Sequence, residues 1–169
     1  EPVGTIFTPP GERVKVAMQT GFIGIRYLLL NTTSTESEVV ARGEGFQTLT
    51  HGSLAKTSFQ ALSDMWSLNE ARMNELKGYS IENHRLNVLH EQARYHMDRA
   101  IDAERDLRWG DYIKHTRAGL GVEARAYPDV KSTQNDVIRG IVFFMLLVIP
   151  CAFFTERLLI TASDIRLQV

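Results

Sequence analysis

Residues 140–155 read GIVFFMLLVIPCAFFT, sixteen consecutive residues without a charged side chain. As an α-helix this stretch is about 24 Å long, slightly less than the roughly 30 Å of a bilayer's hydrocarbon core. Val137 and Ile138 extend it on one side, and residues 158–160 extend it on the other. Because apolar side chains occupy every face of such a helix, the pattern favours a membrane-spanning helix over a helix buried in a small globule.

Charged side chains stand at both ends of the apolar stretch. Arg139 precedes it, and Glu156 and Arg157 follow it. Long charged side chains at the ends of a membrane helix reach into the headgroup region. We therefore expect these three residues at the membrane interfaces. The expected partners are the lipid bilayer and other membrane helices or subunits. Lys131 before the helix and Arg166 after it keep the charge balance too even to set an orientation.

A helical hairpin domain with three helices is expected over residues 53–128. The first helix begins at Thr57 or Ser58 and ends at Gly78, which suits the left-handed residue after a helix. The second runs from about Ser80 to Arg108. Apolar residues on their facing sides recur at helical spacing, so they should cover one another. This mutually buried set comprises Trp66, Met73, Leu86, Leu89 and Met97.

The third and last predicted helices are separated by a proline. The third spans about Asp111 to Ala126, and Pro128 is expected to end it, because proline disfavours helical backbone in the residue before it. The last helix covers residues 132–162, with Ser132 or Thr133 as its N-cap. Pro150 marks the place where a kink is expected.

The N-terminal segment, residues 1–52, is β-leaning or irregular. Residues 13–18 alternate polar and apolar side chains, which is typical of a half-buried strand. Residues 22–30 are denser in apolar side chains and fit either a buried strand or a short helix. Gly43 and Gly45 lack the strand–glycine–helix frame of a phosphate-binding loop. The predicted fold class is therefore mainly α: a helical hairpin, a long C-terminal transmembrane-like helix and a short β-leaning start.

Composition excludes several classes of function. With 169 residues and a net charge of −1, the chain lacks the basic excess of a nucleic-acid-binding protein. Its single cysteine, Cys151, excludes an internal disulfide framework and a cysteine-based zinc site. Residues 90–94 read HEQAR, which lacks the second histidine of a zinc-binding HExxH motif because Arg94 takes its place. His84, His90 and His96 are six residues apart and do not share a helix face.

No catalytic, cofactor-binding or metal-binding constellation emerges from these patterns. The serines lie in no nucleophile-elbow context. We therefore expect a chain that is not an enzyme and has no cofactor, and the sequence identifies no small-molecule substrate. It opens on Glu1 rather than methionine and ends on apolar residues, which is more typical of a piece of a longer protein.

Several stretches resemble a segment of large prokaryotic membrane proteins described as FtsX-like permeases. The stretches are EARAYPDV (123–130), NDVIRG (135–140), Pro150, FTERLL (154–159), DMWSLNEAR (64–72) and IENHRL (81–86). The resemblance covers roughly residues 46–169. It implies an extracytoplasmic helical hairpin that leads into the first of several membrane helices, in a prokaryotic inner membrane. It implies no catalytic residue, and since the chain has no ATPase motif, nucleotide-driven work belongs to a partner.

Two functions are consistent with these observations. The first is a non-catalytic, membrane-anchored helical domain of a larger transport or cell-envelope protein, which acts through protein contacts. The alternative is a soluble helical interaction module that buries its apolar C-terminal helix in an oligomer. The membrane-anchored domain predicts that the aromatic side chains of the last helix are uncovered, whereas a soluble monomer has to bury them.

Overall fold

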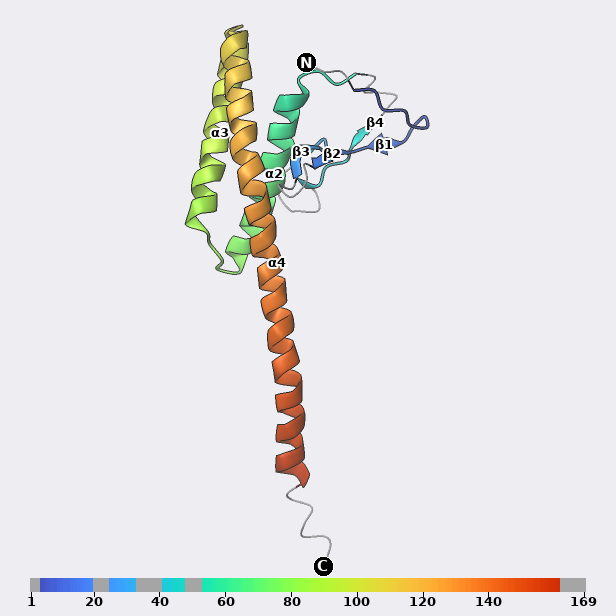
Figure 1. Ribbon diagram of the computed structural model, residues 1–169, viewed down its shortest axis with the longest axis vertical. Helices are drawn as coiled ribbons and strands as arrows, with labels where there is room; N and C mark the ends of the chain where they lie inside the picture. The colour runs from blue at the N-terminus through green and yellow to red at the C-terminus, as the bar shows by residue number, and fades with distance from the viewer. Residues whose placement is uncertain (1–3, 20–24, 33–40, 48–52, 162–169) are drawn as a thin grey trace, which may run out of the picture. The chain divides into compact units, whose positions relative to one another are not determined.

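The computed structural model describes residues 4–19, 25–32, 41–47 and 53–161. The chain divides into two compact units, Glu1–Lys131 and Ser132–Val169. The elements are β1 (Arg13–Val14), β2 (Val16–Gln19), β3 (Ile25–Leu29), β4 (Phe46–Gln47), α2 (Thr57–Gly78), α3 (His84–Arg105) and α4 (Trp109–Thr161) (Figure 1). The predicted fold class is confirmed: the chain is mainly helical, with a small β hairpin near its start and a long apolar helix at its end.

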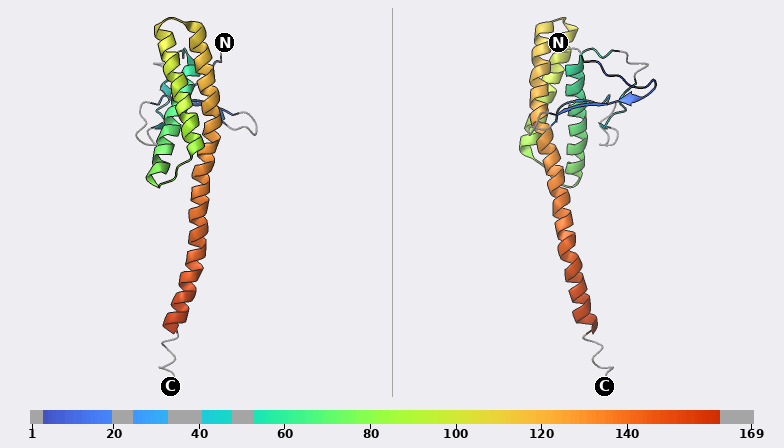
Figure 2. Two further views of the ribbon diagram at one scale, coloured as in Figure 1. Left: turned by 90° about the vertical axis from the view of Figure 1, so that its left-hand side faces the viewer. Right: turned by 45° about the vertical axis from the view of Figure 1, so that its right-hand side comes forward.

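In the first unit, α2, α3 and residues 109–131 of α4 lie side by side (Figure 2). Each helix buries one stripe of side chains, as the helical spacing of apolar residues predicts. Of the five residues expected to cover one another, Met73, Leu86 and Met97 are buried, whereas Trp66 and Leu89 are half-buried. The predicted packing of the hairpin is therefore largely correct, although Trp66 is only half-buried where full burial was expected.

The strands form two small antiparallel pairs. β2 pairs with β3, with Val16 opposite Leu29, and β1 pairs with β4, with Val14 opposite Phe46. The alternation in residues 13–18 thus predicted strands correctly. Of residues 22–30, those described before Leu30 form β3, so the strand alternative holds there; residues 22–24 lie outside the described residues.

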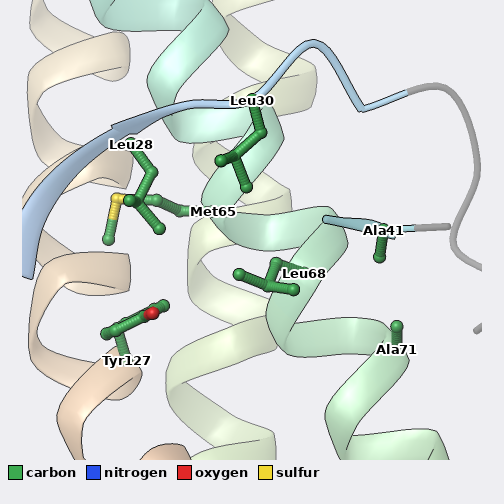
Figure 3. Packing of buried hydrophobic residues seen from close by; sticks show 7 residues of the cluster. All are labelled: Leu28, Leu30, Ala41, Met65, Leu68, Ala71 and Tyr127. Carbon is green, nitrogen blue, oxygen red and sulfur yellow. The ribbon is translucent and has the colours of Figure 1, made fainter. Parts of the chain in front are cut away.

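A hydrophobic core joins β3 to the helices (Figure 3). Leu28 and Leu30 pack with Met65 and Leu68 of α2 and with Tyr127 of α4. All five side chains are at most 9% exposed. Burial of a large apolar side chain contributes about 1.5–3 kcal/mol, so this cluster holds the β hairpin against the helices.

Asp64 fastens the chain after β3 to α2. Its side chain is fully buried, and Oδ2 accepts hydrogen bonds from the backbone N–H groups of Leu30 (2.7 Å) and Asn31 (3.0 Å). Oδ1 accepts from the backbone N–H of Thr32 and from Gln60 Nε2, each at 3.0 Å. A carboxylate with four donors satisfies the condition under which a buried charge is tolerated.

The glycines that we excluded from phosphate binding shape a turn. Gly43 has φ 67°, and a Cβ there would overlap the backbone carbonyl of Leu30. The N–H of Gly45 donates to the same carbonyl at 2.8 Å. Close approach of two backbones therefore requires glycine at position 43.

α2 begins at Thr57 and ends at Gly78, as predicted, but the left-handed residue after it is Ser80, with φ 58°, rather than Gly78. The N–H of Ile81 donates to Leu76 O at 3.0 Å, a bond that closes the helix end with the left-handed residue two positions after the glycine. The second helix begins at His84 rather than Ser80, because the Asn83 side chain accepts from the N–H groups of the first turn.

The prediction that Pro128 ends a helix is wrong. A single helix, α4, covers both the third and the last predicted helices and runs through Pro128 and Pro150. Ser132 and Thr133 are therefore interior residues and not N-caps. An interior proline costs about 3 kcal/mol. Tyr127 and Val130 on either side of Pro128 are buried at 5% and 0% exposure, and their burial offsets that cost.

Candidate functional site

The apolar stretch of α4 leaves its side chains uncovered. From Val142 (54% exposed) to Leu146 (69%), and again at Phe153 (57%) and Phe154 (63%), the large apolar side chains are exposed. The most apolar part of α4 has a mean hydropathy of 2.5, and none of it is buried. Among the described residues, one helix, α4, is long enough and apolar enough to cross a membrane. Soluble proteins rarely expose an apolar surface of this extent.

The three predicted interface residues lie at the ends of this stretch. Arg139 Nη1 is 3.8 Å from Asp136 Oδ1, one helical turn earlier, and both side chains are more than two-thirds exposed. Glu156 and Arg157 are also exposed, and neither forms an ion pair with a described residue. Their role at a membrane interface remains a prediction.

A polar group inside the apolar stretch is internally satisfied. The hydroxyl of Thr155 donates to the carbonyl of Cys151, one turn earlier, at 2.7 Å. This back-bond removes a free hydroxyl from a surface that is otherwise apolar. The Thr155 hydroxyl therefore adds little unfavourable free energy if the stretch lies in hydrocarbon.

The helical bundle of the first unit contains a buried polar cluster, which we call the His–Glu cluster: Asn69 and Glu70 of α2, His90 of α3 and Glu123 of α4. His90 Nε2 lies 2.7 Å from Glu70 Oε2, and His90 Nδ1 lies 3.7 Å from Glu123 Oε2. The amide of Asn69 donates to Glu123 Oε1. Asn69 and Glu123 are fully buried and His90 is 5% exposed, so the cluster connects three helices at their centre.

The aromatic ring of Trp66 covers His90. The Trp66 ring stacks on the imidazole with centroids 4.7 Å apart and planes 11° apart, and Trp66 Nε1 donates to His90 O at 3.3 Å. The guanidinium of Arg94, an exposed residue, lies over the Trp66 ring at 5.0 Å from its centroid. Trp66, which is half-buried, therefore contacts both a buried imidazole and an exposed cation.

The His–Glu cluster was not predicted from the sequence. His90 was considered there as part of an incomplete metal motif and beside His84 and His96, whereas Glu70 and Glu123 lie 20 and 33 residues away from it. One signal was present: His90 continues the spacing of Leu86, Ala93 and Met97 on the buried face of α3. Among the described residues no group of three or more ligating side chains could hold a metal ion. With three of its four side chains buried, the cluster is suited to fixing the three helices relative to one another.

A pair of histidines, His96 and His115, joins α3 and α4. His96 Nδ1 lies 3.1 Å from His115 Nδ1, and Tyr95 packs edge-on against the His96 ring. Burial lowers the pKa of His96 below its ordinary value of 6.5, and the nearby His115 lowers it further. Both rings cannot be charged at this distance without strong repulsion.

Acid is expected to destabilise the bundle through this pair. Because folding lowers the pKa of His96, the unfolded chain binds a proton at His96 more readily than the folded chain does. The contribution of neutral His96 to the free energy of unfolding is therefore complete above pH 6.5, the ordinary pKa of histidine, and is lost as the pH falls below that value. Thermal unfolding of the full chain in detergent, followed between neutral pH and pH 5, tests this. His115→Gln should reduce the loss of stability. An equal loss in both proteins would contradict the assignment to the pair.

No family model, curated protein or solved structure matches the chain.

Proposed function

We propose that this chain is a non-catalytic, membrane-anchored helical domain, part of a larger transport or cell-envelope protein, which acts through protein contacts. The observation that carries the proposal is the uncovered apolar stretch of α4, together with its uncharged length of sixteen residues. A hydrocarbon environment removes the cost of exposing this surface to water. Arg139, Glu156 and Arg157 then anchor the helix at the two interfaces.

The resemblance to FtsX-like permeases supports a more specific version. In that version the first unit is an extracytoplasmic domain in a prokaryotic inner membrane, and α4 continues into the first of several membrane helices. The His–Glu cluster and the Asp64 hydrogen bonds give the domain a fixed shape, which a surface for protein contacts needs. Asp64, Asn69, His90 and Glu123 are buried and Glu70 is partly exposed, which agrees with a role in holding the helices together.

Alkaline carbonate extraction of membranes tests the proposal. We expect the full chain, expressed in a bacterium, to stay in the membrane pellet, because carbonate releases peripheral proteins but not proteins with a spanning helix. A chain that ends at Lys131, the last residue of the first unit, is the matched control and should be released. Release of the full chain as a soluble oligomer would instead support the interaction module that buries α4 between copies.

A further inference from the structure

The beginnings of α2 and α4 line a pocket of about 230 Å³ in the first unit. Ligand pockets for drug-sized molecules run from about 300 to 1,000 Å³, so this one suits a molecule built on a single ring. The pocket shares no residue with the His–Glu cluster or with the apolar stretch of α4. Neither of those two features therefore accounts for this pocket.

One side of the pocket is aromatic. The Phe59 and Tyr112 rings have centroids 6.0 Å apart, and Trp109 meets Tyr112 edge-on at 5.9 Å. Tyr112 is 7% exposed and packs against Ala100 and Ala103 of α3, with Phe59 beside them. Because this wall is fixed by core packing, a flat apolar group finds a preformed surface.

The pocket lining also contains two positively charged side chains. Lys56 and Arg117 both line it, and α2 begins at Thr57, directly after Lys56. Lys56 is a left-handed N-cap, with φ 56°, whose side chain makes no cap hydrogen bond. A helix N-terminus attracts anions through its free N–H groups and its dipole.

The two cations differ in their partners. Lys56 forms an ion pair with Glu104, whose hydrogen bond raises the lysine's pKa and keeps it charged. Arg117 pairs with no described carboxylate. Arg117 is therefore the residue that is available to a bound anion without breaking an existing pair.

A buried hydroxyl in the pocket wall points to a ligand independently of these charges. Thr116 lines the pocket, is 2% exposed, and its Oγ1 has no hydrogen-bond partner among the described residues. A helical threonine ordinarily returns its hydroxyl to the carbonyl one turn earlier. An unsatisfied buried hydroxyl in a pocket that two cations also line can donate a hydrogen bond to a bound anion after a side-chain rotation.

We propose that this pocket binds a small organic carboxylate that carries a single aromatic ring. The ring lies on the wall of Phe59, Tyr112 and Trp109. The carboxylate accepts hydrogen bonds from Arg117 and from the N-terminal end of α2, with Thr116 beside it. This site goes beyond the proposed membrane anchoring and does not depend on it.

Equilibrium dialysis with radiolabelled benzoate tests the site on the full chain in a non-ionic detergent, with empty micelles as the blank. Binding should saturate at one equivalent per chain. Benzamide, which has the same shape without the charge, should compete about tenfold less well, because it loses the charge-assisted hydrogen bonds. Arg117→Gln should weaken benzoate binding by a similar factor. Lys114→Gln removes a nearby charge of α4 that does not line the pocket, and it should leave binding unchanged.

Quenching of tryptophan fluorescence provides a second measurement. The chain has two tryptophans, and Trp109 lies in the pocket. Benzoate should change the emission of the wild-type chain with the same saturation curve as dialysis, and Trp109→Phe should remove that change. Absence of saturable benzoate binding, equal binding of benzamide, or unchanged affinity in Arg117→Gln would each overturn the proposal.

Discussion

Replacing His90 with alanine is expected to lower the free energy of unfolding by about 3–5 kcal/mol, because it opens a cavity at a buried site and leaves the buried Glu123 side chain with fewer polar neighbours. Glu123 is fully buried, and its Oε2 has no partner closer than the imidazole nitrogen at 3.7 Å. Without His90 the carboxylate keeps only the Asn69 amide. The variant also leaves a cavity under Trp66, which adds to the loss.

A double-mutant cycle separates the charge from the cavity. Glu123→Gln keeps the size of the side chain and removes its charge, so His90→Ala should cost about 2 kcal/mol less in that background. The cavity under Trp66 is common to both backgrounds and cancels. Denaturant unfolding of the full chain in detergent, followed by helical circular dichroism, measures the four proteins. Additive costs would show that Glu123 does not interact with His90.

The local elements were largely predictable, because hydrophobic periodicity reports which face of a helix is buried. Leu62, Met73 and Leu76 repeat at helical spacing, and all three are buried in α2. The short strands near the start followed from alternation in residues 13–18. The apolar run at 140–155 is recognised directly from its sixteen consecutive residues without a charge. These features depend on neighbours in sequence, which is the information that a single chain provides most directly.

Helix boundaries were less predictable, because tertiary contacts override local preference. Pro128 is a residue that ends helices in most contexts, yet it lies within α4 here, and the left-handed residue after α2 is Ser80 rather than Gly78. At Pro128 the deciding contacts come from Met73 and Leu86, which cover Val130 on the far side of the proline. Those contacts join residues more than forty positions apart, and no local rule contains them.

The candidate sites were missed for the same reason. Glu70, His90 and Glu123 come from three helices, and Lys56 and Arg117 line one pocket only because the beginnings of α2 and α4 lie close together in the fold. The immediate neighbours of His90 exclude a metal motif. The signal that remained is that His90 continues the buried stripe of α3. A polar residue at a core position needs a buried partner, although the sequence does not say which one.

The depth of an introduced charge should decide between a membrane and a protein environment for α4. Arginines at Leu147 and Val148, the centre of the uncharged stretch, are expected to oppose membrane insertion by about 5–7 kcal/mol in total. Arginines at its ends, in Gly140→Arg with Thr155→Arg, should cost little, because they can extend to the interface beside Arg139 and Glu156. The fraction of chain resistant to carbonate should therefore fall sharply for the central pair and hardly at all for the terminal pair. If α4 is instead buried between copies of a soluble chain, its environment has no interfaces and the cost follows contacts rather than depth. Equal losses for both pairs would contradict the membrane assignment, since only a bilayer makes the centre of the helix the costliest place for a charge.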